Sequence, residues 1–598
     1  MRYENLNGDF KVRAIAGTRT VLIVLDCPEN LRHGLMGFGF WRETVGAADP
    51  DPKWLRSLKV FRSVIPDPPN AKDPKDPTKA RRFDTEEFPI QSFLWSDYTA
   101  DPGTRYRFRV VPMYGAPGDL EKREGLSFEI TTEQEYGQGI GVWFNRGVIA
   151  SQAFAREFGN SAPPEPENPA HKVTAWLSRG LLEACLQFIN GTKPGEGLRV
   201  AAYEFTYQPV LKALKSALER GVDLLVVYGY EEPTAKGKIC ANDTAIDKAG
   251  LPREYGGKQV LFHRTKATIP HNKFIVRLDN NGGAVSVWTG STNFTESGFL
   301  GQSNVGTIID DPAIAAVYLA YWKAVREDPV RDDLRPAVMA LTPQPPAVVP
   351  ADSITPLFSP RPTSGMLKWF GERIRDAAGA VMITTPFGVS EALIEPLAED
   401  RDFLRYVLME KPPTDKVKAR LTRDKDLQYA YGAVLGEIYT FRNGEPTARK
   451  PIREFELDKW LLKEDHYRHG GGFVFFVHTK FLIIDALSND PLLCSGSANF
   501  SPNSILLNDE NVLLFRGNQR VTDIFLTEFD RIFRHFYIRK TINENAGELD
   551  LENKVAFLDE TSAWTDKHFL PGSFSSRRRE MFFADPAKTW VTQAMEHR

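Results

Sequence analysis

The pattern of apolar and polar positions along the chain changes near residue 135. Before it, short β-branched runs such as KVRAIAG and TVLIVLDC alternate with turn-rich stretches, and no long helical period appears. A charged, proline-rich stretch, PPNAKDPKDPTKARR, interrupts this part at residues 68–82. The pattern predicts an antiparallel β-sandwich over residues 1–135.

From about residue 136, helical and strand patterns alternate. KVTAWLSRGLLEACLQFIN, residues 172–190, predicts one helix with its apolar side chains on one face. Strands and helices then follow in turn, ending in the long helix PAIAAVYLAYWKAVRED. The same order recurs between MLKWFGERIRDAAGA and VTDIFLTEFDRIFRHFY. Because neighbouring strands are joined by short turns as well as by helices, each half is expected to be an α/β sandwich of mixed sheets flanked by helices.

The recurrence has a nearly constant spacing, which indicates a duplicated unit. Trp369 lies 193 residues after Trp176, and His478 lies 207 residues after His271. The additional residues of the second copy fall mainly at 411–470. We therefore predict two repeats, at 136–335 and 366–545, joined by a Pro-rich linker at 336–365. Residues 546–598 are expected to form a tail that packs on the catalytic domains.

Each copy carries the same polar residues at the same places. His271 and Lys273 recur as His478 and Lys480, and each pair is followed by an apolar run and a Gly-Ser-x-Asn sequence. Positions i and i+2 of a strand face the same side, so each His-Lys pair forms a cationic wall that suits a phosphate. The serines and asparagines of the turns can donate hydrogen bonds to phosphate oxygens; they are Ser291, Asn293, Ser497 and Asn499.

Two such sets, meeting at one phosphate, would have the parts that phosphodiester cleavage needs. One imidazole attacks phosphorus and forms a phosphohistidine. The other protonates the leaving oxygen and then activates water. The lysines and asparagines hold the charge that develops on the oxygens, and neither a metal nor another cofactor is required. We assign His271 as the nucleophile and His478 as the general acid, although the symmetry of the sequence leaves the order open.

The constellation resembles the signature of the phospholipase D superfamily, H-x-K-x4-D followed by G-S-x-N. The second copy, with Asp485, fits throughout, whereas Asp279 of the first copy stands one residue late. The distance from Asp to the Gly of the Gly-Ser-x-Asn sequence is 11 residues in both copies, so the additional residue lies between Lys and Asp, as in a β-bulge. The resemblance implies a bilobal α/β fold and the hydrolysis or exchange of phosphodiester bonds in phospholipids, nucleic acids or other diesters.

Several further residues are candidates for supporting roles. Asp279 and Asp485 are expected to order the scaffold. Glu510 stands where related sequences carry an acid that orients a histidine, and Ser303 occupies the corresponding place in the first copy. Tyr203 and Glu204 end a strand, where they could line a pocket or pack in the core. In the N-terminal part, TRYRFRVVPM resembles a strand of fibronectin type III and immunoglobulin-like sandwiches, with Tyr106 at a corner.

Composition and net charge limit the partners and the cellular compartment that the sequence allows. The net charge of −3 argues against a surface coated with positive charge for nucleic acid, although a local basic groove stays possible. Four widely spaced cysteines suggest buried thiols in a reducing compartment. No apolar run approaches the ~18–20 residues that span a bilayer, so peripheral membrane contact is the only membrane role expected. The N-terminus lacks a secretion signal, which favours a cytoplasmic protein, with leaderless export left open. Two copies in one chain suggest a monomer.

Phospholipid hydrolysis or transphosphatidylation is the preferred function, and a metal-independent nuclease is the alternative. A non-catalytic scaffold is the third possibility, which the paired histidines disfavour. The insert supports the nuclease, because basic residues interleaved with aromatics can bind single strands. They can equally contact lipid headgroups or form a solvated loop. The residues are Lys416, Lys418, Arg420, Arg423, Arg442, Arg449 and Lys450, with Tyr429, Tyr431, Tyr439 and Phe441.

Overall fold

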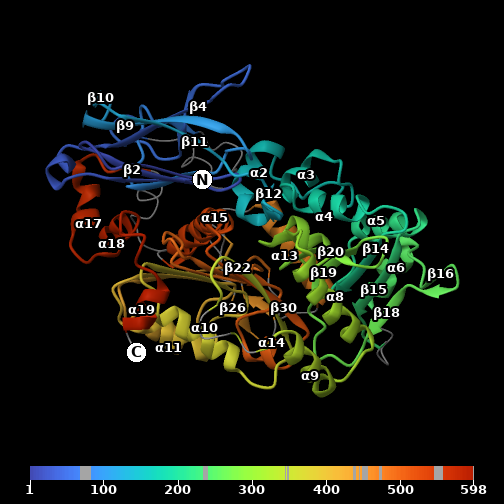
Figure 1. Cartoon of the computed structure of the whole chain (residues 1–598). Coiled ribbons are helices and arrows are strands. Elements are labelled where there is room, and N and C mark those ends of the chain that lie inside the picture. Colours follow the sequence, from blue (N-terminus) through green and yellow to red (C-terminus); the bar gives the residue numbers. More distant parts are fainter. Residues whose placement is uncertain are drawn as a thin grey trace.

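The computed structural model of the chain contains two small antiparallel sheets and two large mixed sheets (Figure 1). It describes residues 1–66, 82–232, 240–343, 345, 349–434, 440–442, 445–447, 455–469, 475–544 and 557–596. The predicted mixed α/β class is confirmed. Among the described residues, no helix has both the length and the apolar character needed to cross a bilayer.

The two small sheets form the N-terminal part and share one core. Alternate side chains of facing strands, such as Val12 and Ile23 in one sheet and Phe40 and Phe108 in the other, are buried together. The Tyr106 hydroxyl accepts a hydrogen bond from the Asp101 amide at 2.9 Å. The fibronectin- or immunoglobulin-like assignment stays a prediction. The first sheet is β1 (Arg2–Asn5), β2 (Lys11–Ala16), β3 (Val21–Asp26) and β8 (Leu94–Asp97), and the second is β10 (Asp119–Lys122), β9 (Arg105–Ala116), β4 (Gly37–Thr44) and β5 (Lys53–Trp54), with β11 (Leu126–Thr131) also on β9.

The first large sheet has eight strands in the order β12-β13-β21-β20-β19-β14-β15-β18. The β14, β15 and β18 strands run parallel, and the remaining pairs are antiparallel. The bounds are β12 (Tyr136–Gly137), β13 (Ile140–Phe144), β14 (Gly197–Ala202), β15 (Asp223–Gly229), β18 (Leu261–Arg264), β19 (Lys273–Leu278), β20 (Ala284–Gly290) and β21 (Val305–Ile309).

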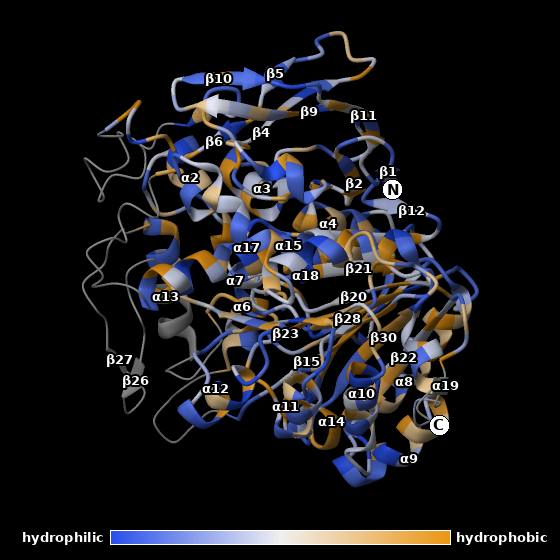
Figure 2. Ribbon diagram, turned by 90° about the vertical axis from the view of Figure 1, so that its left-hand side faces the viewer, coloured by the Kyte–Doolittle hydropathy of each residue, from blue (hydrophilic) through white to orange (hydrophobic). Residues whose placement is uncertain are grey.

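The second large sheet repeats this arrangement with seven strands, in the order β22-β30-β29-β28-β23-β24-β25. Once β12 is set aside, each neighbouring pair has the same relative direction as its counterpart in the first sheet. Its strands are buried and apolar (Figure 2). The bounds are β22 (Ser353–Ser359), β23 (Ala380–Thr385), β24 (Leu404–Met409), β25 (Leu427–Tyr431), β28 (Phe481–Ile484), β29 (Leu492–Gly496) and β30 (Glu510–Arg516).

Helices flank both large sheets. Those of the first half are α2 (Ser151–Phe158), α3 (Lys172–Ser178), α4 (Leu181–Asn190), α5 (Gln208–Glu219), α6 (Ala241–Ala249), α7 (Glu296–Leu300), α8 (Pro312–Arg326) and α9 (Arg331–Leu341). Those that follow are α10 (Gly365–Arg375), α11 (Glu391–Ala398), α12 (Asp415–Leu421), α13 (Glu456–His469), α14 (Pro502–Leu506), α15 (Gln519–Glu544), α17 (Asp566–Phe569), α18 (Phe574–Met581) and α19 (Trp590–Glu596).

The single helix expected over residues 172–190 is wrong, because the chain forms two helices there. Arg179 takes a left-handed conformation with φ 53° and ends α3, and Gly180 follows with φ 92°. This bend aims the Arg179 guanidinium at the buried carboxylate of Glu528, whose oxygens lie 2.8 and 2.9 Å from Nη1. The long-range ion pair therefore accompanies a break in a segment whose apolar period is continuous.

Helix α15 joins the N-terminal sheets to the large sheets. Arg2 of β1 pairs with Asp523, and Ser96 of β8 donates a hydrogen bond to Asp530 at 2.7 Å. The backbone of Gly17 approaches α15 so closely that a Cβ there would lie 2.0 Å from Thr527 Oγ1. The N-terminal part is thus held against the side of the molecule that carries α15 (Figure 1).

Two segments that were expected to lie outside the repeats have defined contacts. Residues 353–359 of the Pro-rich stretch form the edge strand β22, paired along β30. In the C-terminal tail, the Trp564 indole donates to the carbonyl of Leu35 at 2.7 Å, and the Trp590 indole donates to that of Asp490 at 3.0 Å. The described tail residues therefore contact both the N-terminal sheets and the second large sheet.

Candidate active site

The expectation that each His-Lys pair lies on a strand is wrong, because β19 begins at Lys273 and β28 begins only at Phe481. The segments that lead into these strands and carry the pairs are each tied to the opposite half. The amide of Ser303 donates to the carbonyl of Phe476 at 2.7 Å, and the amide of Asp509 donates to that of Ile269 at 3.0 Å. These contacts are reciprocal, because the accepting residues, Phe476 and Ile269, each lie two positions before the histidine of their own half. They bring the two His-Lys pairs to the junction of the halves.

Each histidine is oriented by a residue of the opposite half. His271 is buried, and its Nδ1 lies 2.8 Å from Glu510 Oε2, which also accepts a hydrogen bond from Ser497 at 2.7 Å. His478 is buried in the same way, with its Nδ1 2.8 Å from the side-chain oxygen of Asn304. With Nδ1 engaged, Nε2 is the ring nitrogen left for chemistry.

The counterpart of Glu510 in the first half is Asn304, and our placement of Ser303 there is wrong. The hydroxyl of Ser291 donates to the Asn304 side-chain oxygen at 2.8 Å, just as Ser497 donates to Glu510, and both pairs are 13 residues apart. Asn304 matches in type Asn511, the residue after Glu510, and pairing these two asparagines puts Ser303 opposite Glu510, one residue too early. The serine hydroxyls were expected to donate to phosphate oxygens, but they donate to Asn304 and Glu510, the side chains that orient the histidines.

The two lysines are almost fully buried, and each is bound to the histidine two residues before it. Lys273 Nζ and Lys480 Nζ donate to the carbonyls of His271 and His478, both at 2.6 Å. Burial lowers the pKa of Lys273 from 10.5 to about 7, and it lowers that of Lys480 well below its usual value, with repulsion from Lys273 contributing. An anion placed between them would restore both charges.

Burial favours the neutral form of both imidazoles. Burial lowers the pKa of His271, and the neighbouring Glu510 carboxylate partly opposes this. Burial also lowers the pKa of His478, to well below its ordinary value, and repulsion from Lys480, Lys273 and His271 adds to it. The charges of the two pairs therefore act on one another across the junction.

Tyr203 and Glu204 lie beside the His-Lys cluster. The sequence had left open whether they line a pocket or pack in the core. The Tyr203 ring centroid is 5.3 Å from that of His271 and 5.5 Å from Lys273 Nζ. The side-chain amide of Asn293 donates to the Glu204 carboxylate. The register explains this, because β14 pairs with β19 up to the residue before Tyr203.

The two asparagines of the Gly-Ser-x-Asn turns are also buried. The side-chain oxygens of Asn293 and Asn499 have no hydrogen-bond partner within the described part of the chain. Polar groups buried in this way are rare unless a ligand or water completes them. These unpaired oxygens are hydrogen-bond acceptors, so they cannot donate to a phosphate oxygen, and the side-chain NH2 of Asn293 donates to Glu204.

Asp279 and Asp485 bind backbone amides. Asp279 accepts from the amides of Asn281 and Gly283, both at 2.8 Å, in the turn after β19. Asp485 accepts from the amides of residues 378–380 at the start of β23. Neither carboxylate hydrogen-bonds to a histidine or lysine among the described residues.

The additional residue before Asp279 does accompany an irregular register, but the bulge lies on the opposite strand. Arg277 pairs with Ser286, whereas the next residue, Leu278, pairs with Ala284. Val285 of β20 is therefore the residue without a partner, so the bulge belongs to β20 rather than to the stretch between Lys273 and Asp279.

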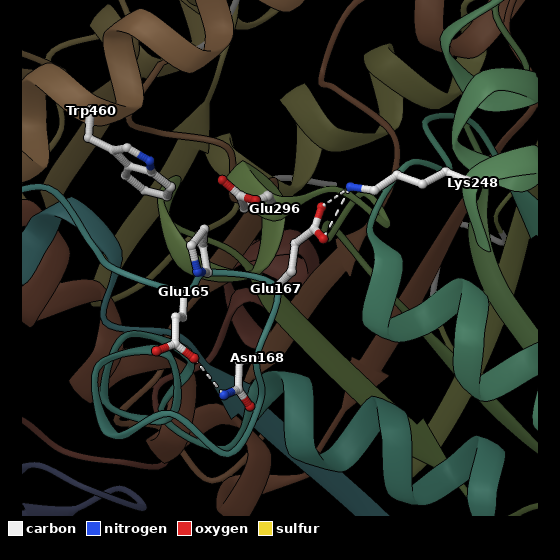
Figure 3. Close-up of a pocket in the computed structure, with 7 residues that line it drawn as sticks. Glu165, Glu167, Asn168, Lys248, Glu296 and Trp460 are labelled. Atoms are coloured by element: carbon white, nitrogen blue, oxygen red, sulfur yellow. Dashed lines mark hydrogen bonds and ion pairs between the residues drawn. The ribbon is translucent and has the colours of Figure 1, made fainter.

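A surface depression of about 590 Å³ lies elsewhere, between the first half and α13 (Figure 3). Lys248 pairs with Glu167 at its rim, and Asn168 donates to Glu165. With Glu296, the depression presents three carboxylates, which would repel an anionic diester. The residues that line it are Glu165, Pro166, Glu167, Asn168, Lys248, Glu296 and Trp460.

The described part of the insert leaves Lys416, Lys418 and Arg423 exposed, but its described aromatic side chains are not exposed with them. Arg420 pairs with Glu391 and Glu395 of α11, and Tyr429 and Tyr431 are buried. Tyr439, Arg449 and Lys450 of that hypothesis lie outside the described residues. Phe441 and Arg442 belong to the short strand β26 (Thr440–Arg442), of which only the backbone is described. No group of three or more His, Cys, Asp or Glu suited to a metal ion occurs within the described ranges.

Comparison with known proteins gives a family match within the first half. Residues 185–325 match the family model described as cardiolipin synthase, PLD-like domain. This stretch includes the first His-Lys pair and its Gly-Ser-x-Asn turn. No curated protein matches the chain.

Several solved structures are similar. Nuc from Salmonella typhimurium, titled a phospholipase D family member, is 29% identical over 24% of this chain and 86% of its own, with a TM-score of 0.20. A phosphatidylserine synthase of Haemophilus influenzae Rd KW20 is 13% identical over 64% of this chain and 94% of its own, with a TM-score of 0.40. NucT from Helicobacter pylori is 21% identical over 26% and 91%, with a TM-score of 0.20.

Proposed function

We propose that this chain, which belongs to the phospholipase D superfamily, cleaves phosphodiester bonds through a phosphohistidine intermediate. The observation that carries the proposal is the reciprocal arrangement of the histidines. His271 and His478 each have Nδ1 bound by the opposite half and a buried lysine two residues on. A single phosphate at the junction would meet both sets.

The chemistry runs in two displacements. Nε2 of one histidine attacks phosphorus, an N–P bond forms, and the P–O bond to the alcohol breaks. The other histidine gives its proton to the departing oxygen. It then takes a proton from water, whose oxygen attacks phosphorus and breaks the N–P bond. The lysines stabilise the charge on the non-bridging oxygens, and the side-chain NH2 groups of Asn293 and Asn499 join them where the substrate displaces Glu204 from Asn293.

Glu510 supports His271 as the nucleophile. Phosphorylation at Nε2 leaves the imidazole ring positively charged, with its proton on Nδ1. The Glu510 carboxylate stabilises that charge, whereas His478 faces the neutral side chain of Asn304. His478 then acts as general acid and base. Substrate phosphate supplies the negative charge that raises the pKa of His478 and lets it hold the proton.

We further infer that the two large sheets are repeats of one unit, at 136–335 and at 353–545, where the second repeat begins with β22 rather than at residue 366. The equal order of strand directions and the reciprocal contacts at the junction support this. The N-terminal part, 1–135, and the tail, 546–598, would then be accessory, and one chain would hold a complete site as a monomer. Phospholipid is the proposed substrate; the buried Tyr429 and Tyr431 remove part of the support for a nuclease.

Purified protein should be incubated with matched panels of phospholipids and of single- and double-stranded nucleic acids. His271→Ala and His478→Ala are expected to lower turnover by at least about 10³-fold. With a phosphorus-labelled activated diester, His478→Ala should accumulate an acid-labile label on the protein, and His271→Ala should not. Activity that survives both substitutions would refute the mechanism, as would loss in EDTA that added divalent metal reverses.

A further inference from the structure

A buried carboxylate outside the His-Lys-Asn cluster holds the segment that leads into His478. Glu410 follows the last residue of β24 and is 3% exposed. Its Oε1 accepts from the amide of Phe475 at 2.6 Å, and its Oε2 accepts from that of Val477 at 2.7 Å. The amide of Phe476, between them, lies 3.2 and 3.1 Å from the two oxygens.

Three successive amides bound to one carboxylate fix the direction of the backbone. Charge-assisted hydrogen bonds of this kind are stronger and more directional than neutral ones. The segment continues directly into His478, whose own amide donates to Ser303 Oγ at 3.3 Å. The approach to His478 is thus fixed by Glu410 on one side and by the first half on the other.

The chain makes room for this carboxylate in a specific way. At Gly432, just after β25, a Cβ would lie 2.7 Å from Glu410 Oε2. The position that corresponds to Glu410 in the first half, one residue beyond the β15 residue Tyr228, is Gly229. The carboxylate is therefore present in the second half only, and it supports only one of the two histidines.

We infer that Glu410 is a positioning residue for His478, which it acts on through the backbone of residues 475–477. The inference rests on the proposed function, in which His478 protonates the leaving alcohol. A misplaced general acid harms poor leaving groups most, because a good leaving group departs without a proton. Loss of Glu410 should therefore change how the rate depends on the leaving group.

The test uses aryl methyl phosphates whose leaving phenols run from p-nitrophenol to phenol. Because the second displacement is common to all esters, the comparison uses kcat/KM, which reports the step that releases the phenol. In Glu410→Gln, kcat/KM for the phenyl ester should fall by ~10–100-fold, in the range of other supporting residues, while kcat/KM for the p-nitrophenyl ester should change by less than about twofold. His478→Ala should show the same trend more steeply. Glu510→Gln should lower all esters alike, and Glu391→Gln, at an exposed carboxylate, should leave the series unchanged.

Gly432→Ala provides a second variant, because its Cβ would lie 2.7 Å from Glu410 Oε2 and 2.9 Å from the Glu410 backbone oxygen, so that Glu410 must shift while the residue itself is kept. It should reproduce the leaving-group trend of Glu410→Gln even where that variant folds poorly. An equal loss for every ester in a folded Glu410→Gln or Gly432→Ala, or no loss, would overturn the inference. Absence of diester cleavage by the unsubstituted protein would instead refute the proposed function.

Discussion

Glu510 and Asn304 occupy equivalent positions opposite the two histidines, yet one is a carboxylate and the other an amide. Each lies 2.8 Å from the Nδ1 of a histidine and accepts a hydrogen bond from a serine 13 residues earlier. The Glu510–His271 and Asn304–His478 contacts are alike in geometry, but Glu510 can carry a negative charge and Asn304 cannot. That difference breaks the symmetry of the pair and gives the histidines different chemistry.

Glu510→Gln should lower turnover by roughly 10²–10⁴-fold, as when the acid behind a catalytic histidine is replaced by its amide. A glutamine can turn its NH2 toward His271 and stabilise the wrong tautomer, and it cannot offset the charge of a phosphorylated ring. Rapid-quench measurement of the labelled enzyme should show a slower first step. Asn304→Asp is the matched change opposite His478; an equal or larger loss there would contradict the assignment of roles.

Lys273→Met should abolish most activity and yet raise stability. The folded pKa of about 7 lies below the ordinary value of 10.5, so burial penalises the ammonium. The stability contributed by the neutral amine is present above pH 10.5 and is lost as pH falls through about 7. At pH 6 the unsubstituted protein therefore carries the whole penalty, and the variant should gain at least about 1 kcal/mol there. Urea unfolding at pH 6 checks this, and a destabilised variant would contradict it.

Binding of sulfate, whose charge is constant near neutral pH, should weaken as the pH rises above about 7, because Lys273 then loses its proton. The inhibition constant should rise by ~10-fold per pH unit above that value. Competitive inhibition of diester cleavage, measured from pH 6 to 9, provides the profile. In a Lys273→Met protein tested by direct calorimetric binding, the profile should flatten; an unchanged slope would assign the titration to another group.

Arg264→Met should destabilise the protein by ~3–5 kcal/mol, because it leaves Asp509 buried without its cation. Arg264 Nε lies 2.7 Å from Asp509 Oδ2, and both side chains are almost fully buried across the junction of the halves. Denaturant unfolding gives the magnitude. Adding Asp509→Leu should recover part of the loss; if the double variant is less stable than the single one, the pair is not the cause.

Gly17→Ala should destabilise the contact between the N-terminal sheets and α15 by ~1–3 kcal/mol, the usual cost of overpacking. The new Cβ would lie 2.0 Å from Thr527 Oγ1. Turnover per folded molecule should stay within about twofold, since the contact is remote from the histidines. Thr527→Ala removes that oxygen and should restore stability in the double variant; additive losses would place the strain elsewhere.

The periodicity of apolar residues predicts most of the strands and helices, because this periodicity depends only on residues that are close together in the sequence. The recurring order of elements and the two His-Lys pairs are visible in the sequence. The break at Arg179 was missed although Gly180, which follows it, is a local helix-stop signal. The ion pair of Arg179 with Glu528, 349 residues away, has no local signal. The partner of His478 was missed by one residue, since an asparagine in place of an acid gave no chemical signal. Glu410 was missed because its partners are backbone amides, which carry no side-chain signature.

The crossed support of the histidines also bears on how such a chain can change over time. Glu510 is 239 positions from His271, and Asn304 is 174 positions from His478. Replacing Glu510 or Asn304 therefore changes the surroundings of the histidine in the opposite half. Neither half can drift alone, and compensating changes between distant segments of the gene should mark the lineage of this protein.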